Sequence, residues 1–237
     1  MRLQENDIKK IEAASLSEGL EMVSELFLGK VVFSSSLGRE DQVITDAIFR
    51  NDLPIKIFTL DTGRLFNEAY ELLEKTTARY KKNIEVYFPN AKDVEEFVSK
   101  KGINGFYESI ENRKECCNIR KVKPLNRALE GAEVWITGLR AEQSDTRKEM
   151  PMIEWLEDKQ LYKFNPILHW SFADVLDYIK EFYVPYNPLH DKGFISIGCA
   201  PCTRAVEPGE DPRAGRWWWE TSKKECGLHI KATETVK

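Results

Sequence analysis

Hydrophobic positions in the first fifty residues change from helical spacing to a short continuous run and back again. Residues 6–29 carry isoleucine, leucine, valine and phenylalanine at near-helical spacing, and Gly29 follows as a stop signal, which predicts one or two short helices. Residues 30–33 form a β-branched and aromatic run that predicts a strand. A loop of small residues comes next, and residues 40–50 return to helical spacing. The predicted order is therefore strand, small-residue loop, helix.

The same alternation continues to about residue 182. Apolar strand runs that alternate with helices predict an α/β fold, a mostly parallel sheet with helices on both faces. In such a sheet the ligand lies outside the carboxyl ends of the strands. The further predicted strands are 55–60, 84–88 and 133–137, and the further predicted helices are 66–80, 91–100, 119–129 and 172–182, the last with Ser171 as its N-cap.

Length and composition place the chain among globular proteins with a real core. It has 237 residues, of which 42% are hydrophobic, so collagen-like, disordered and disulfide-scaffold classes are excluded. No repeat or low-complexity tract divides it. We therefore expect one nucleotide-binding α/β domain over residues 1–205 and a C-terminal segment over residues 206–237.

The charge and the apolar runs restrict the partners. The longest apolar runs fall far short of the roughly 20 residues that a membrane helix needs. Residues 1–10 are charged and no apolar stretch follows them, so we expect no secretory signal and a cytoplasmic protein. Lys and Arg number 35 against 39 Asp and Glu, a net charge of −4, which argues against DNA or RNA binding through a basic surface. Arginine and lysine can still gather locally around a small anion.

Three predicted strands end in loops suited to an anion. The loop Ser34–Asp41 has small side chains and opens a helix, so that backbone N–H groups and the helix N-terminus can meet a phosphate. A serine-rich turn with an N-cap is an equal alternative, and the loop lacks the Gly-Lys-Ser/Thr ending of a Walker A motif. The loops Leu60–Arg64 and Thr137–Arg147 also follow strands. Side by side, the three would form an anion site of nucleotide size.

The five cysteines form two pairs and a remainder. Cys116 and Cys117 are adjacent, and Cys199 and Cys202 form a CxxC about 80 residues later. Four such ligands suggest zinc or an iron–sulfur cluster. Adjacent cysteines diverge too widely to share one zinc ion, whereas a four-iron cluster offers a separate iron to each thiolate. The pattern favours a cluster without excluding zinc or buried cysteines that act as small hydrophobes.

The remaining thiol, Cys226, lies near the end of the chain in the sequence Glu-Cys-Gly-Leu-His. Lys223, Lys224 and His229 are close in sequence, and nearby cations favour the nucleophilic thiolate. An unremarkable tail cysteine is the alternative. Upstream, residues 211–220 combine two arginines with three consecutive tryptophans. Arginine forks suit phosphate and sulfate oxygens, and the tryptophans predict that this segment docks on the domain.

Seven segments together resemble the assimilatory adenylyl-sulfate (APS) reductases, the iron–sulfur members of the PAPS/APS reductase family. They occur in the same order and with similar spacing from about residue 20 to residue 230, and the two cysteine pairs with the Cys226 tail are highly specific. The segments are 34–41, 61–64, 116–117, 137–147, 199–202, 213–220 and 225–229.

The resemblance implies an adenine nucleotide α-hydrolase-like fold and the reduction of APS to sulfite and AMP in sulfate assimilation and cysteine biosynthesis. It implies that Cys226 attacks the sulfate sulfur and that thioredoxin, as a separate protein, releases sulfite from the resulting S-sulfocysteine. It also implies a [4Fe-4S] cluster on Cys116, Cys117, Cys199 and Cys202 that supplies structure and electrostatics. The implied substrate-binding residues are Ser34, Ser35, Ser36, Gly38, Leu60, Lys121, Gly138, Arg147, Arg213, Arg216 and His229.

By the same resemblance, Lys121 lies between cluster and substrate, and the Ser34–Gly38 loop lines the nucleotide. PAPS reductases lack the cysteine pairs, but some cluster-bearing members accept both nucleotides, so PAPS reduction or dual activity is the alternative. This sequence contains no thioredoxin-like segment, so we expect the reductant to be a separate protein. The oligomeric state, including a homo-oligomer, stays open.

Two other function classes are weaker alternatives. An ATP-pyrophosphatase-fold enzyme that adenylates or thiolates its substrate needs a Ser-Gly-Gly-x-Asp-Ser loop, which the Ser34–Asp41 loop does not provide. A non-catalytic zinc or cluster module for nucleic acid would need a strongly basic face and would have no use for Cys226.

Overall fold

The computed structural model describes residues 2–144 and 147–220. Within this part, six strands form one sheet in the order β3-β2-β1-β4-β6-β5. β1 is parallel to β2 and β4, β4 is parallel to β6, and β5 is antiparallel to β6. The strands are β1 (Val31–Ser35), β2 (Lys56–Leu60), β3 (Glu85–Tyr87), β4 (Val134–Ile136), β5 (Ile153–Leu156) and β6 (Leu161–Phe164).

The central strands are buried on both faces, as continuous apolar runs predict. In β1, Phe33 pairs with Ile57 of β2 and with Ile136 of β4. Successive residues of a strand point to opposite faces, and Val31, Val32 and Phe33 are all buried. The predicted α/β fold with a mostly parallel sheet is therefore confirmed.

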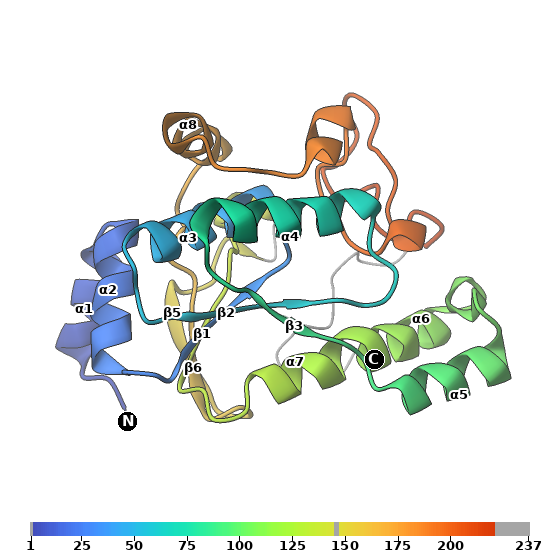
Figure 1. Cartoon of the computed structure of the whole chain (residues 1–237), viewed down its shortest axis with the longest axis horizontal. Coiled ribbons are helices and arrows are strands. Elements are labelled where there is room, and N and C mark those ends of the chain that lie inside the picture. Colours follow the sequence, from blue (N-terminus) through green and yellow to red (C-terminus); the bar gives the residue numbers. More distant parts are fainter. Residues whose placement is uncertain (1, 145–146, 221–237) are drawn as a thin grey trace. The chain divides into compact units, whose positions relative to one another are not determined.

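Helices follow the strands along the chain (Figure 1). The sequence predicted most of them to within a few residues, whereas α6 and the β5–β6 hairpin were not predicted. The α-helices are α1 (Glu5–Ala13), α2 (Leu16–Leu26), α3 (Arg39–Arg50), α4 (Asn67–Tyr80), α5 (Ala91–Lys101), α6 (Ile110–Cys117), α7 (Lys123–Ala128) and α8 (Phe172–Phe182). Short 3-10 helices cover 105–107, 141–143, 188–192 and 200–202, and a π-helical turn covers 118–122.

Polar side chains close the first turns of several helices. Ser15 and Glu18 form a capping box at α2, in which each side chain bonds a backbone N–H of the other. At α8, the predicted N-cap Ser171 accepts a hydrogen bond from the backbone N of Asp174 at 3.1 Å. These bonds satisfy N–H groups that a helix start otherwise leaves open.

The apolar faces of α2, α3 and α8 build the core with one face of the sheet. α2 packs beside α1 and α3, and α3 also packs on β1 and α8 (Figure 1). The centre of this core is fully buried, which is what the helical spacing of residues 6–29 and 40–50 requires. Residues with 0% exposure in it are Leu20, Val23, Phe33, Val43, Ile44, Ala47, Ile48, Val134, Ile136, Ile167 and Val175.

The described chain divides into two compact units. The first comprises the described parts of 1–59, 69–85 and 131–187, and therefore holds α1, α2, α3, α8 and most of the sheet. The second comprises 60–68, 86–130 and the described chain from 188 onward, with α5, α6 and α7. The division of the sequence at residue 205 stays a prediction.

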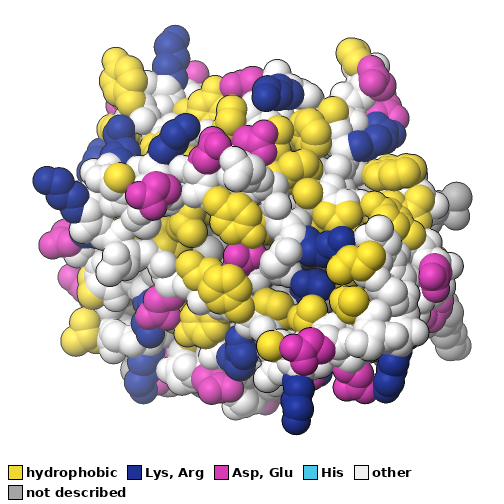
Figure 2. Space-filling view, turned by 45° about the vertical axis from the view of Figure 1, so that its right-hand side comes forward, with side chains coloured by type: hydrophobic (Ala, Val, Ile, Leu, Met, Phe, Trp, Pro, Cys, Tyr) yellow, Lys and Arg dark blue, Asp and Glu magenta, His cyan; other side chains and the backbone are white. Residues whose placement is uncertain are grey.

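The surface carries both charges. On the face drawn in Figure 2, Lys and Arg side chains are interspersed with Asp and Glu, in line with the small net charge. Among the described residues, no helix combines the length and the apolar character that crossing a membrane requires.

Candidate active site

The loop after β1 is closed by a carboxylate from the helix that follows it. The backbone N and the hydroxyl of Ser36 both donate to Oδ2 of Asp41, at 2.5 and 2.6 Å. Leu37 lies in the left-handed region (φ 61°) and its N donates to Oγ of Ser35 at 3.2 Å. Gly38 is the N-cap of α3 and has no side chain to cover the helix start. The loop is thus held in a tight turn in front of a helix N-terminus, an arrangement that suits an anion.

Asp41 also explains the glycine that follows β4. A Cβ on Gly138 would lie 2.0 Å from Oδ1 of Asp41 and 3.3 Å from its backbone N. Only glycine permits this approach. Asp41 is buried, and burial raises its pKa to about 6 although the two Ser36 hydrogen bonds lower it. The predicted residues Ser36 and Gly138 therefore both lie against one buried acid.

Ser34 is engaged within the sheet. Its hydroxyl accepts a hydrogen bond from Nε1 of Trp135 on β4 at 2.8 Å. The same hydroxyl lies 3.5 Å from the carbonyl oxygen of Ile136. Ser34 thus links β1 to β4 where both strands approach their carboxyl ends.

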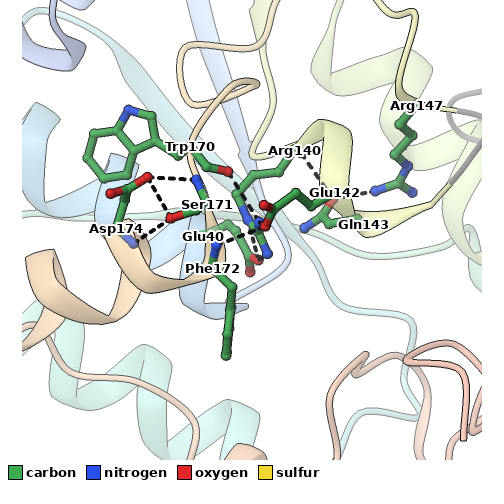
Figure 3. A network of polar contacts seen from close by, with 9 residues as sticks. All are labelled: Glu40, Arg140, Glu142, Gln143, Arg147, Trp170, Ser171, Phe172 and Asp174. Atoms are coloured by element: carbon green, nitrogen blue, oxygen red, sulfur yellow. Dashed lines mark hydrogen bonds and ion pairs between the residues drawn. The ribbon is translucent and has the colours of Figure 1, made fainter.

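Arg140, which sequence reasoning did not select, ties this edge of the first unit together (Figure 3). Its Nε donates to Oε1 of Glu40 on α3 at 3.0 Å, and its Nη1 donates to Oε2 of Glu142 at 2.9 Å. Glu142 Oε2 also accepts from the backbone N of Phe172, in the first turn of α8, at 3.0 Å. The buried guanidinium thereby fixes the loop after β4 against the starts of two helices.

The predicted Arg147 is held by the same loop. Its Nη1 donates to Oε1 of Gln143, and that oxygen also accepts from the backbone N of Arg140 at 3.1 Å (Figure 3). Arg147 is 7% exposed. A buried guanidinium oriented by a neutral amide is a suitable group to meet a phosphate or a sulfate.

The four paired cysteines meet in the second unit. Cys116 and Cys117 end α6, and Cys199 and Cys202 flank a short 3-10 turn. None of the four takes part in a disulfide, and all four line one small pocket. Among the described residues, no three His, Cys, Asp or Glu side chains are close enough to hold one metal ion. The other lining residues are Arg64, Phe106, Arg113, Arg120, Lys121 and Pro201.

Cations around the pocket act on the thiols. Burial tends to raise the pKa of Cys199, but Lys121 and a contact with the Thr62 hydroxyl outweigh it, and the pKa is lowered. Thr62 Oγ1 lies 3.3 Å from Cys199 Sγ. Burial raises the pKa of Cys202 to about 12, with a further contribution from Cys199. The predicted Lys121 is thus part of the cysteine pocket.

The loop after β2 supports the CxxC turn. The backbone N of Ala200 donates to the carbonyl oxygen of Arg64 at 2.8 Å. Arg120 Nη1 donates to the carbonyl oxygen of Thr62 at 2.6 Å, which connects this loop to the π-helical turn after Cys117. The predicted Leu60 ends β2 and is half-buried at the start of the loop. The segment 60–64 therefore joins the two cysteine pairs.

The arginine and tryptophan segment docks on the CxxC turn, as its tryptophans predicted. Arg216 forms an antiparallel β-bridge with Thr203, and the backbone N of Trp217 donates to the carbonyl oxygen of Cys202 at 3.1 Å. Arg216 is buried, and its Nε has no hydrogen-bond acceptor among the described residues. A Cβ on Gly198 would lie 2.4 Å from Arg216 Nη2, so a larger residue there would displace the guanidinium.

Of the remaining predicted residues, the structure describes Arg213. Arg213 is half-buried, and its backbone N donates to Oδ1 of Asp211 at 2.8 Å. Cys226 and His229 lie outside the described residues. Ser34, Ser35, Ser36, Gly38, Gly138 and Arg147 therefore belong to the first unit, and Leu60, Lys121, Arg213, Arg216 and the four cysteines to the second, where Lys121 and the cysteines line one pocket.

Sequence reasoning missed several polar residues of these sites. Arg113 and Arg120 line the cysteine pocket, but in a chain with 35 Lys and Arg their residue type alone does not distinguish them. Helical spacing offers one signal, since Arg113 precedes Cys117 and Arg120 follows Cys116 by four residues each. Asp41 carried a comparable signal, because it lies three residues after Gly38 in the first turn of a predicted helix.

Comparison with known proteins agrees with this arrangement. The family model of the phosphoadenosine phosphosulfate reductase domain matches residues 30–205. The adenosine 5'-phosphosulfate reductase of Allochromatium vinosum is 52% identical over 213 residues, which cover 89% of this chain and 83% of the relative. The reductase of the same name from Sinorhizobium fredii strain USDA 257 is 51% identical over 222 residues, 93% of this chain and 88% of the relative.

Solved structures agree in fold. The crystal structure of phosphoadenylyl-sulfate (PAPS) reductase from Candida auris, a phosphate complex, matches with a TM-score of 0.72 at 30% identity, covering 87% of this chain and 99% of that one. An FMN adenylyltransferase from Candida glabrata matches with a TM-score of 0.55 at 15% identity, over 92% of this chain and 76% of that one, which shows the fold alone. The two cysteine pairs lie at one pocket, and about half of the aligned residues are identical to those of the reductases from Allochromatium vinosum and Sinorhizobium fredii. The chain therefore belongs to the adenosine 5'-phosphosulfate reductase family.

Proposed function

We propose that this protein reduces adenosine 5'-phosphosulfate (APS) to sulfite and AMP, through an S-sulfocysteine on Cys226 and with thioredoxin as a separate electron donor. The cytoplasm and cysteine biosynthesis are its proposed setting. The observation that carries the proposal is the cysteine pocket. Two cysteine pairs line it beside Lys121 and Arg113, and Glu220 of the docked segment lies six residues before Cys226 in the sequence.

The first chemical step transfers the sulfonate group. The Cys226 thiolate attacks the sulfate sulfur of APS, so that an S–S bond forms and the S–O bond to the phosphate breaks. AMP leaves with the bridging oxygen and the electron pair of that bond. Negative charge therefore develops on the phosphate as the thiolate approaches an anionic sulfate. Fixed cations lower the barrier of such a step.

The second step supplies two electrons from a dithiol. One thioredoxin thiolate attacks Sγ of Cys226, which releases sulfite and forms a mixed disulfide. The second thioredoxin thiol then attacks that disulfide and restores the Cys226 thiolate. Thioredoxin leaves with its own disulfide, so both electrons end on the sulfur of sulfite.

This chain's residues offer matching groups for substrate binding. The Ser35–Gly38 turn and the N-terminus of α3 suit the nucleotide phosphate, and Gly138 lets the Asp41 carboxylate that holds this turn approach closely. Arg147, Lys121 and Arg216 are the proposed cations for phosphate and sulfate, and Arg213 and His229 are proposed to join them. Leu60 and Gly138 are proposed to contact the adenosine.

A [4Fe-4S] cluster on Cys116, Cys117, Cys199 and Cys202 is the proposed cofactor. The donor set suits it, because all four cysteines line one pocket and thiolates are the ligands that such clusters use. The buried Arg216 Nε, which lacks an acceptor in the described chain, supports an anionic group nearby. When bound, the cluster would supply local structure and electrostatics.

Replacement of the nucleophile tests the mechanism. Cys226→Ser is expected to keep the iron–sulfur absorbance of protein purified without oxygen, because Cys226 is not one of the four proposed ligands. It is expected to form no sulfite from APS and reduced thioredoxin, because a serine hydroxyl cannot carry the S-sulfo group to a dithiol. The readout is a thioredoxin-coupled sulfite assay with the unaltered protein as control. Normal turnover by Cys226→Ser would overturn the mechanism.

The same assay decides the nucleotide. The match to a PAPS reductase structure makes reduction of PAPS, alone or beside APS, the second candidate. We expect kcat/KM for APS to exceed that for PAPS by at least tenfold, since the cysteine pairs are the feature that resembles APS reductases. Equal values would assign dual activity, and a preference for PAPS would contradict the proposed substrate.

A further inference from the structure

A buried ion pair fastens the last described residue to the helix that carries two of the cysteines. Nε and Nη2 of Arg113 donate to Oε1 and Oε2 of Glu220, each at 2.9 Å. The two side chains are 6% and 5% exposed. Arg113 belongs to α6, one turn before Cys117, and also lines the cysteine pocket. Both partners lie in the second unit.

This ion pair is one of two contacts that connect residues 217–220 to the two cysteine pairs. On one side, Trp217 is bonded through its backbone N to the carbonyl oxygen of Cys202. On the other side, Glu220 is bonded to Arg113 on the helix of Cys116 and Cys117. The Arg113 guanidinium lies 4.7 Å from the ring centroid of the buried Trp217. Residues 217–220 therefore contact both the CxxC turn, at Cys202, and the helix α6 that carries Cys116 and Cys117.

Stability alone does not account for a buried ion pair at this place. Apolar side chains of similar volume would hold two segments together as well, because desolvation offsets most of the Coulomb attraction. A bidentate arginine–carboxylate pair adds a fixed direction, since two parallel hydrogen bonds define the orientation of both planes. Glu220 is also the acidic residue from which the chain leads into the segment with the nucleophile.

We propose that Arg113 and Glu220 form an anchor that fixes where and in which direction the segment with Cys226 leaves the cysteine pocket. Both are positioning residues for the attack of Cys226 on APS, and this role rests on the proposed function. Six residues separate Glu220 from Cys226, and six extended residues span at most about 20 Å. The anchor therefore sets an upper limit on the distance between Glu220 and the Cys226 thiol.

The tether length sets a threshold for the effect. Without the ion pair, the nearest described contact becomes that of Trp219, seven residues before Cys226, whose ring lies 4.4 Å from the ring of Tyr107 between centroids. Effective concentration falls with about the −3/2 power of tether length, so this change alone lowers it only about 1.3-fold. A larger decrease reports the loss of direction, because attack requires near-linear approach to the sulfur.

The test measures the first chemical step by itself. Holoprotein is mixed with APS in the absence of thioredoxin, and AMP release and the S-sulfo adduct on Cys226 are followed by chromatography and mass spectrometry. Glu220→Gln keeps the shape of the side chain but removes its charge, and Glu220→Asp keeps the charge on a shorter arm. The matched control is Glu210→Gln, because Glu210 forms an exposed bidentate pair with Arg204 in the same unit.

For Glu220→Gln we expect the rate of adduct formation at saturating APS to fall at least tenfold, with the Kd for APS within twofold of the unaltered value. The rate for Glu220→Asp should lie between those of Glu220→Gln and the unaltered protein, and the rate for Glu210→Gln should equal that of the unaltered protein. Rates within twofold of the unaltered protein in both Glu220 variants would overturn the anchor. If Glu220→Gln is purified without iron absorbance, the test rests on Glu220→Asp alone, and a rate within twofold of the unaltered protein then overturns the anchor.

Amide hydrogen exchange separates this result from a failure of the proposed reaction. The anchor predicts faster exchange of the amides of residues 217–220 in Glu220→Gln than in Glu210→Gln, whether or not APS reacts. Unchanged exchange would contradict the anchor. The absence of adduct in the unaltered protein would contradict the proposed function and leave the exchange test intact.

Discussion

Asp41 is a residue whose carboxyl pKa is shifted by the fold. It is buried behind the loop after β1, where Ser36 donates two hydrogen bonds to one of its oxygens. Burial nevertheless dominates and raises its pKa from 3.8 to about 6. Between these values the folded protein binds more protons than the unfolded chain. Its contribution to stability is therefore complete below about pH 4 and is lost as the pH rises through about 6.

We therefore expect Asp41→Asn to become more stable relative to the unaltered protein as the pH rises from 4 to 7. At about 1.4 kcal/mol per pKa unit, the shift amounts to about 3 kcal/mol at most, or several degrees in Tm. Thermal unfolding of both proteins across this range measures the difference. Asp52→Asn is the control, because the Lys82 hydrogen bond lowers the pKa of the exposed Asp52, so that its effect has the opposite sign and falls below about pH 4, outside this range. A Tm difference between Asp41→Asn and the unaltered protein that does not change with pH would contradict the assignment.

At the scale of elements, regular spacing decided what the sequence could predict. α3 and α8 have clear apolar faces, and α8 also has its Ser171 cap, so both were predicted to within one residue. α6 has the sequence Ile-Glu-Asn-Arg-Lys-Glu-Cys-Cys, which has no apolar stripe at helical spacing. It packs through cysteines and a buried arginine, and periodicity does not detect those residues.

The β5–β6 hairpin was missed for a different reason. Its strands have four residues each and are joined by a polar turn, so alternation is too short to stand out. All four residues of β6 are buried, and one of them is Lys163, whose ammonium lies 5.9 Å from the ring centroid of Trp135. A buried lysine contradicts the apolar pattern expected of an inner strand, and only the neighbouring strand explains it.

The candidate sites were predictable where a residue type is rare and not where it is common. Cysteines at 116, 117, 199 and 202 stand out in any sequence, and the structure places them at one pocket. Arg140 and Glu220 are ordinary charged residues in a chain that is 31% charged. Their roles depend on partners far away in sequence, Glu40 for one and Arg113 for the other. Spacing rules reach four residues along a helix and do not reach such pairs.

At the scale of the whole molecule, the two units make different demands on a cofactor. The first unit has a large apolar core of its own. In the second unit, four thiols from chain segments about 80 residues apart surround a pocket. A cluster on these thiols would cross-link the segments. By the chain-entropy estimate for a cross-link, closing a loop of that length stabilises the folded state by about 4.5 kcal/mol. Stability of the second unit is therefore expected to depend on the cluster.

Cys199→Ser tests this dependence, because it removes one proposed ligand and leaves the other three. We expect protein purified without oxygen to lose its iron and its visible absorbance. We also expect faster amide hydrogen exchange in α6 and in residues 199–220, because the segments that the cluster would join are then held by hydrogen bonds alone. The core of α3 and β1 in the first unit is the internal control, and its exchange should stay unchanged. Iron content equal to that of the unaltered protein, or one zinc and no iron in the unaltered protein, would contradict the cluster. Loss of iron with unchanged exchange would show that the second unit folds without the cluster's support.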